Sequence, residues 1–257
     1  MKLKIEKTNV INDVSTWFRF AEPEGGIAQW KAGRSAMEFA RYMTTANPGQ
    51  MPEEIRRYLD GIGFNDRQFT CYPEEVTSFH GYNIGTRSGR HHDGLLVSDN
   101  DNCLVGIEAK VSESFDKSIS KKIEEAKSNS DKGKNMRDRI ANSLKLVKRD
   151  FDRESLSDEK IGSLMYQLVS GTVGTIIEAD KRNISRASFL IIEFVGEVEK
   201  ESNYESKVKN NKEAYDNYLD FLGLSGKGDS ERYLNVNLKD KTIQIFFAKI
   251  QISITKR

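Results

Sequence analysis

The chain has 257 residues, of which 37% are hydrophobic, and its 40 Lys and Arg residues nearly balance its 39 Asp and Glu residues. This length and composition allow a substantial buried core, so a single domain over 1–257 is the simplest expectation. The near-neutral charge gives no global attraction to nucleic acid, which would have to come from a local asymmetry of charge. No apolar run approaches the ~20 residues that cross a bilayer, which argues against a membrane-spanning protein and predicts a cytoplasmic one.

The first half of the chain shows helical and then β-type periodicity. Apolar residues at helical spacing predict a helix over 33–46, and Pro52 suits the first turn of a short helix that ends at Gly61. Over 69–111 the pattern changes to short apolar runs separated by turn residues, which predicts three strands. This half therefore combines helices with part of a sheet.

The second half contains one polar stretch and several regular elements. Residues 112–135 are rich in Ser, Lys and Glu, and 128–134 have the composition of an exposed, mobile loop. Periodicity predicts helices over 135–150, 158–180 and 205–223 and strands over 187–195 and 242–254. We therefore expect an α/β fold with a mixed central sheet flanked by helices, in which 33–195 form the core and 205–254 add a C-terminal helix and strand.

The run 103–111 carries the main chemical signal. Its odd-numbered positions are all apolar or small, whereas Glu108 and Lys110 share the other parity. Because side chains two residues apart on a strand point to the same face, Glu108 and Lys110 are expected to project together.

Asp93 is the expected partner of this pair. The run that contains it is joined to the next strand by a turn-rich segment, and a symmetric hairpin centred between Asn100 and Asp101 places Asp93 directly across from Glu108. Opposed residues of an antiparallel pair have Cα atoms ~4.5–5.5 Å apart, and like charges so placed destabilise a sheet. A divalent cation between the carboxylates removes this conflict, and hard oxygen ligands suit Mg²⁺ or Mn²⁺.

Lys110 would give such a metal site a hydrolytic chemistry. A lysine beside the metal can orient an attacking water or stabilise charge that develops on a phosphoryl group. The structural alternative is a surface hairpin in which Lys110 forms an ordinary ion pair, worth about 0.2–1 kcal/mol. The residues alone leave both interpretations open.

The order of these elements, together with Ile107-Glu108-Ala109-Lys110-Val111 followed by Glu113 and Phe115, resembles the PD-(D/E)xK nuclease superfamily, and most closely its uncharacterised bacterial members. The resemblance covers roughly 33–195, and His92 stands where the name of the superfamily has proline. It implies a restriction-endonuclease-like core and a Mg²⁺- or Mn²⁺-dependent nuclease, with DNA as the expected substrate and a homodimer as a common assembly.

The resemblance also assigns roles to individual residues. It implies that Asp93, Glu108 and the carbonyl of Ala109 hold the metal, and that Lys110 is the catalytic lysine. Two further catalytic candidates follow from positions that superfamily members often use, Glu38 on the first helix and Gln167 on a helix after the motif.

Glu38 and Gln167 each have a structural alternative. Ser35-x-x-Glu38 also fits a capping box at a helix N-terminus, in which the glutamate has no catalytic role. Gln167 lies among apolar residues, and a lone helix glutamine commonly faces solvent or bonds to backbone.

Two basic segments are candidates for contact with nucleic acid. The glycine-flanked segment 85–90 contains Arg87 and Arg90 and fits either a phosphate-binding loop or a flexible hairpin loop. The segment 132–149 has seven basic residues and one acidic residue, and a helix there directs outward Lys134, Arg137, Lys145 and Lys148. A solvated helix face explains the second segment equally simply.

Two functions of other classes remain alternatives to a nuclease. The first is a catalytically silent, nuclease-like module that binds nucleic acid or a protein partner, because a fold does not establish an activity. A stand-alone interaction protein, with the charged stretches 112–135 and 197–213 docking a partner, is the second. An intact Asp, Glu and Lys set favours the enzyme.

Overall fold

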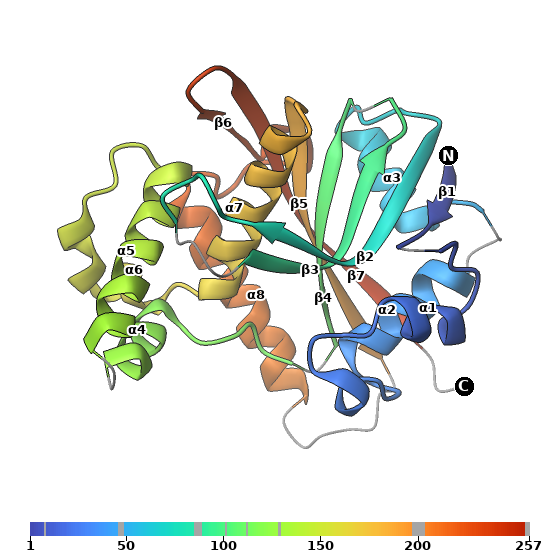
Figure 1. The fold of residues 1–257 in the computed structure, drawn as a ribbon, viewed down its shortest axis with the longest axis horizontal. Coiled ribbons are helices and arrows are strands. Elements are labelled where there is room, and N and C mark those ends of the chain that lie inside the picture. Colours follow the sequence, from blue (N-terminus) through green and yellow to red (C-terminus); the bar gives the residue numbers. More distant parts are fainter. Residues whose placement is uncertain are drawn as a thin grey trace.

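A seven-stranded mixed sheet lies at the centre of the computed structural model, with the strand order β1-β2-β3-β4-β5-β7-β6 (Figure 1). The structure describes residues 1–7, 9–45, 49–84, 89–100, 102–111, 113–127, 130–196 and 204–254, with side chains left out at 127 and 130–134. The strands are β1 (Lys2–Ile5), β2 (Gln68–Ser78), β3 (Gly89–Ser98), β4 (Leu104–Lys110), β5 (Arg186–Gly196), β6 (Tyr233–Asn237) and β7 (Thr242–Ile254). The expected α/β class with a mixed central sheet is confirmed.

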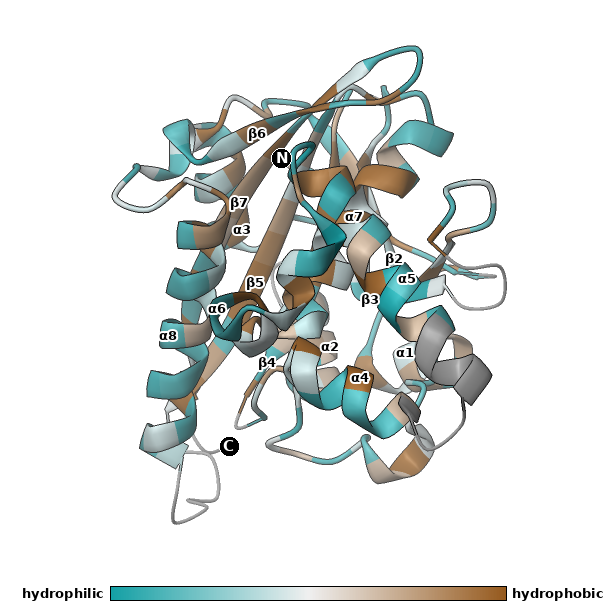
Figure 2. Ribbon diagram, turned by 90° about the vertical axis from the view of Figure 1, so that its left-hand side faces the viewer, coloured by the Kyte–Doolittle hydropathy of each residue, from teal (hydrophilic) through white to brown (hydrophobic). Residues whose placement is uncertain are grey.

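Helices cover both faces of this sheet (Figure 1). On one face lie α1 (Val14–Phe20), α2 (Ser35–Thr45) and α3 (Glu53–Gly61). On the other lie α4 (Ile119–Lys127), α5 (Ser130–Val147), α6 (Glu159–Ser163), α7 (Tyr166–Lys181) and α8 (Tyr204–Phe221). Two apolar cores result, one on each side of the strands, and Figure 2 shows β5 and β7 as mainly hydrophobic ribbons behind the mixed surface of α8.

The middle of the sheet is parallel, antiparallel ladders flank it on both sides, and the edge strand β1 pairs parallel with β2. Strands β4, β5 and β7 run in one direction, and their register brings Lys110, Glu193 and Gln251 level at the carboxyl ends. Strands β2 and β3 form antiparallel ladders toward one edge, and β6 pairs antiparallel with β7 at the other. Every residue of β4 is buried, as expected of a central strand covered on both faces. Polar side chains on β4 therefore need partners within the fold.

Most of the expected elements are confirmed, and two expectations are wrong. The polar stretch 112–135 is largely helical: α4 buries Ile119 and Ile123 four residues apart, and α5 begins at Ser130 within the expected loop, of which 128 and 129 lie outside the described residues. The helix expected over 158–180 is two helices, α6 and α7, because the chain turns extended at Leu164 and Met165. Strands β1, β6 and β7, which lie outside 33–195, belong to the same sheet.

Close contact between α7 and the sheet depends on glycine. A Cβ atom at Gly171 would lie 2.5 Å from two ring atoms of Phe189 on β5, whose side chain is fully buried. We expect Gly171→Ala to lower the free energy of unfolding by about 1–3 kcal/mol, because the extra methyl overpacks a filled core. Urea denaturation measures this change.

Gly61→Ala is the matched control for this substitution. Gly61 also lies in a helix, but a Cβ atom there would meet nothing within 4 Å. Alanine should leave the protein as stable or raise its free energy of unfolding by up to about 1 kcal/mol, since alanine favours helix more than glycine does. Equal losses in both variants would contradict the packing argument.

Among the described residues, no helix combines the length and the apolar character needed to cross a bilayer.

Candidate functional site

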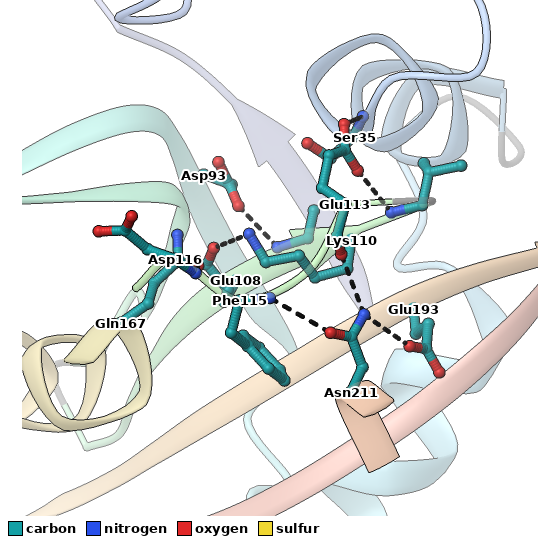
Figure 3. Close-up of polar contacts among 12 residues, drawn as sticks. Ser35, Asp93, Glu108, Lys110, Glu113, Phe115, Asp116, Gln167, Glu193 and Asn211 are labelled. Atoms are coloured by element: carbon teal, nitrogen blue, oxygen red, sulfur yellow. Dashed lines mark hydrogen bonds and ion pairs between the residues drawn. The ribbon is translucent and has the colours of Figure 1, made fainter. Parts of the chain in front are cut away.

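Strands β3 and β4 pair in the register that the symmetric hairpin predicts. Gly94 pairs with Ile107 and Val97 with Leu104, and the ladder ends at Gly94, one residue short of the expected pair between Asp93 and Glu108. The side chain of Asp93 continues the pairing instead, because its Oδ2 accepts a hydrogen bond of 2.6 Å from the backbone N–H of Ala109 (Figure 3). The sequence thus predicts the register, and the structure adds an in-plane link from Asp93 to the motif strand.

Strand β2 bends beside this point. Tyr72 and Thr77 both reach α7, Tyr72 beneath the guanidinium of Arg182 and Thr77 through a hydrogen bond of 3.0 Å to Glu178. Residues five apart face opposite sides of a regular strand. Because Tyr72 and Thr77 face the same side, the alternation of side chains along β2 shifts by one residue between them. The change coincides with Glu74, whose φ of 48° is in the left-handed region that non-glycine residues rarely adopt.

Strand β3 changes phase opposite Glu74. Leu95 packs in the core under α7, yet His92, three residues away, also lies against α7, since a Cβ atom on Gly174 would be 3.0 Å from its Nε2. Asp93 lies at the point where the alternation of side chains along β3 shifts, which explains why its side chain points along the sheet toward β4. Backbone strain of this kind costs on the order of 1–3 kcal/mol and is concentrated at functional sites.

Glu108 and Lys110 project together from the same face of β4, as the parity predicts. Lys110 Nζ lies 2.7 Å from Glu108 Oε1, and the guanidinium of Arg90 on β3 forms an ion pair with Glu108 Oε2. The exposed fractions of these side chains are only 2% for Glu108, 8% for Lys110 and 13% for Arg90. The arrangement is a buried network, and the expectation of a surface hairpin is wrong.

Burial and charge set the protonation behaviour of the site. Burial raises the pKa of Asp93, against the opposing effect of the Lys110 ammonium and the Ala109 N–H. Burial lowers the pKa of Lys110, against the opposing effect of Asp93. Burial and then the charge of Asp93 raise the pKa of Glu74 to about 9. Asp93, Glu74 and Lys110 are therefore close enough to influence one another's charge.

His92 lies in the floor of the site as a neutral ring. It is fully buried, and burial lowers its pKa to about 3. Neither ring nitrogen has a hydrogen-bond partner among the described residues. Gly106 and Gly174 leave room for the ring, because a Cβ atom at either would lie within 3.2 Å of it.

Hydrogen bonds tie the segment after the motif to α2 and α8 (Figure 3). Glu113 accepts hydrogen bonds from the backbone N–H of Val111 at 3.0 Å and of Ser35 at 3.3 Å, which joins the end of β4 to the start of α2. Asn211 of α8 accepts from the N–H of Phe115 and donates to the carbonyl of Glu113. The path of the chain past Lys110 is therefore fixed from both faces of the sheet.

A second buried ion pair lies beside the first. Glu193 on β5 is fully buried and forms an ion pair of 2.8 Å with Lys249 on β7, and Asn211 and Gln251 donate further hydrogen bonds to it. Glu193 is the ladder partner of Lys110. Polar groups thus continue across the carboxyl ends of β4, β5 and β7.

The remaining candidates lie at the border of this network. Glu38 is buried and accepts hydrogen bonds from the N–H of Gly33 at 2.9 Å and from Arg41 at 2.8 Å, so its described bonds stabilise the start of α2. Gln167 accepts from the N–H of Asp116 at 3.1 Å and ties the segment after the motif to α7. In the described residues neither side chain bonds to Asp93, Glu108 or Lys110.

A divalent cation at this site would have few protein ligands among the described residues. No group of three or more His, Cys, Asp or Glu side chains in the described residues is arranged to hold a metal. Mg²⁺, however, is commonly bound by one or two carboxylates together with water and substrate phosphate. Asp93 and Glu108 supply two such carboxylates, and buried Ala109 lies between Glu108 and Lys110 on the same strand.

The basic segments have separate positions in the fold. Residues 85–88, including Arg87, lie outside the described residues, whereas Arg90 belongs to β3 and the buried network. On α5 the inward stripe predicted from helical spacing consists of Met136, Ile140, Leu144 and Val147, of which the last three are buried and Met136 is partly buried. Arg137, Lys145 and Lys148 are exposed, although Lys148 also lies 4.9 Å above the ring of Phe221, and the side chain of Lys134 lies outside the described part.

Sequence reasoning missed several members of the site. It assigned Arg90 to a loop, because Gly89 reads as a turn signal, and it gave no role to Glu74, whose left-handed backbone has no local signature. Glu193 was included in an apolar run, and Asn211 was assigned only to a helix. A polar residue within an otherwise apolar strand was the one available signal for Glu193.

Comparisons with known proteins provide a family and no activity. No curated protein and no solved structure matches the chain. The family model that matches residues 10–253 is described as a domain of unknown function, DUF6946, and the chain belongs to this family.

Proposed function

We propose that this protein is a divalent-metal-dependent phosphodiesterase, and specifically a nuclease, that uses Asp93, Glu108 and Lys110. The observation that carries the proposal is the position of Lys110, whose ammonium lies 2.7 Å from Glu108 and interacts electrostatically with Asp93, while Asp93 is bonded to the strand residue between them. The proposal includes a restriction-endonuclease-like core and a cytoplasmic location.

Each residue would have a distinct part in hydrolysis. Asp93 and Glu108 would hold Mg²⁺ or Mn²⁺, with the Ala109 carbonyl as a further ligand, and the bound metal would supply an activated water and neutralise charge on the phosphoryl oxygens. The water oxygen would attack phosphorus and lose a proton to solvent, the phosphorus–oxygen ester bond would break, and the departing oxygen would gain a proton from solvent. Lys110 keeps its positive charge beside the phosphoryl group and stabilises the charge that develops there.

The direct test is cleavage of labelled nucleic acids. We expect the full chain to hydrolyse at least one of single-stranded DNA, double-stranded DNA, single-stranded RNA or double-stranded RNA with Mg²⁺ or Mn²⁺, and a chelator to abolish the activity. The four substrates decide between DNA, which the resemblance implies, and RNA. Inactivity on all four with either metal would count against a nuclease.

A second candidate function is favoured by the ion pairs of Glu108. Both of its oxygens are paired with cations, as in a structural network of buried charges. In that case the domain binds nucleic acid or a protein without cleavage and without metal. Nucleic-acid binding that is unaffected by chelator, together with inactivity, would select this candidate.

The basic face of α5 is the proposed track for the nucleic-acid backbone. We expect the triple replacement of Arg137, Lys145 and Lys148 by Gln to weaken binding similarly for all sequences, because these residues would contact phosphates. The salt dependence of binding should flatten by up to about one slope unit for each lost contact. Fluorescence anisotropy at several salt concentrations measures both effects.

The partial engagement of Lys148 refines this prediction. Its ammonium already lies above Phe221 and donates to the Phe221 carbonyl at 3.2 Å, so Arg137 and Lys145 should account for most of the change. An unchanged salt slope in the folded triple variant would remove α5 from the binding surface.

A further inference from the structure

Glu108 is neutralised within the protein on both of its oxygens. Lys110 occupies Oε1 and Arg90 occupies Oε2, and Glu108 is almost completely buried. A metal ion that binds Glu108 must therefore compete with a positive charge already in place. Lys110 is needed for the proposed chemistry, which leaves Arg90 as the group that must give way.

The position of Arg90 allows it to move. Lys110 is in the ladder between β4 and β5, and the backbone of Arg90 is in the ladder between β2 and β3, but Arg90 precedes the first pair of the β3 and β4 ladder at Gly94. The stem of Arg90 passes against α7 at Gly174, where a Cβ atom would lie 2.8 Å from its Cγ. Its Nε has no hydrogen-bond partner in the described residues. In the described residues, the guanidinium of Arg90 forms its ion pair with Glu108 at the end of a long side chain, and Asp93 is a further carboxylate that interacts with it electrostatically.

Guanidinium chemistry identifies what Arg90 would bind after displacement. Arginine remains charged and presents paired N–H donors that match two oxygens of a phosphate. A substrate phosphodiester at the proposed metal would be adjacent to Glu108, and hence within the reach of the side chain that Glu108 releases.

We propose that Arg90 is the internal counter-ion of Glu108 in the metal-free protein, and that a divalent cation displaces its guanidinium, which then binds the substrate phosphate. This inference rests on the proposed function and deepens it. It predicts that metal binding and phosphate binding assist each other, because the metal frees the group that the phosphate needs.

Metal affinity is the first measurement. Titration calorimetry with Mn²⁺ and with Mg²⁺ alone should show about fivefold or tighter binding in Arg90→Met than in the wild type, because the competing cation is gone. Arg90→Gln retains a hydrogen-bond donor for Glu108 and should show the same direction of change, which keeps the test decisive if the methionine variant does not fold.

Arg182→Met is the matched control. Arg182 also forms an arginine–glutamate ion pair, at 2.8 Å from Glu178, which lies one turn of α7 beyond Gly174 and belongs to a pair that does not include Glu108. Its replacement should leave the affinity for both metals unchanged.

Coupling to nucleic acid is the second measurement. In a Lys110→Met background, which prevents cleavage, Mn²⁺ should raise the affinity for a labelled oligonucleotide, and Arg90→Gln, which keeps a hydrogen-bond donor for Glu108, should reduce that rise by about fivefold. Equal metal affinity in the wild type and both Arg90 variants, or an undiminished rise, would overturn the role of Arg90 alone. Absence of metal binding in the wild type and in every variant would overturn the proposed function itself.

Discussion

Replacement of Lys110 by methionine is expected to lower kcat for the proposed hydrolysis by about 10²–10⁴-fold while the protein still binds Mg²⁺. Methionine has a similar length and no charge, so the variant removes the ammonium that lies between Asp93 and Glu108. Glu108 keeps Arg90 as a counter-ion in this variant, which preserves the fold. Cleavage kinetics and calorimetry on the same preparation measure both properties.

Lys241→Met is the control for this variant. Lys241 also forms an ion pair with a carboxylate, at 3.0 Å from Asp180, but it lies near the hairpin between β6 and β7. Its loss should leave kcat within about threefold of the wild type, since surface ion pairs contribute little. A Lys110→Met variant with wild-type kcat would remove Lys110 from the chemistry.

Glu108→Gln is expected to abolish cleavage, to weaken metal binding and to destabilise the fold together. A neutral amide leaves Arg90 and Lys110 with no charge partner on β4, and removal of one member of a buried pair costs about 3–5 kcal/mol. Urea denaturation with and without Mg²⁺ separates the two roles. The wild type should be stabilised by the metal, and the variant should not be.

Glu193→Gln provides the comparison that isolates the metal. Glu193 is a fully buried carboxylate on the neighbouring strand and forms an ion pair with Lys249, so the same substitution removes an equivalent charge. We expect a similar loss of stability but a retained stabilisation by Mg²⁺. If Glu108→Gln retained that stabilisation as well, Glu108 would be a structural residue and no metal ligand.

The sequence predicted the sheet and the motif where local patterns are strong. The alternation of apolar residues with Glu108 and Lys110 determined which face the pair occupies, and the turn-rich connection determined the register of β3 and β4. Both follow from the two-residue period of a strand, which any chain must obey. The C-terminal helix and strand, predicted over 205–223 and 242–254, are α8 and β7.

The details that create the network could not be predicted from local pattern. The left-handed backbone of Glu74 and the in-plane direction of Asp93 arise from a bend shared by two strands. The partnership of Arg90 with Glu108 depends on this bend and on a glycine of α7 far along the chain. Such contacts are tertiary, and neither residue carries a sign of them in its sequence neighbours.

The polar stretch after the motif shows a different reason for error. Its Ser, Lys and Glu content predicted a loop over 128–134 and no helix before it, but Ile119 and Ile123 lie four residues apart and both are buried in α4. Two apolar residues at helical spacing were sufficient to dock a short helix, because the core beneath α7 supplies the remaining stability.

The most direct test of the account is a crystal structure of the full chain with Mn²⁺, using the anomalous signal of the metal. The account predicts a Mn²⁺ ion coordinated by a carboxylate oxygen of Asp93 and one of Glu108, with the guanidinium of Arg90 no longer paired with Glu108. An intact Arg90–Glu108 ion pair in crystals that contain Mn²⁺ at another place on the protein would contradict it.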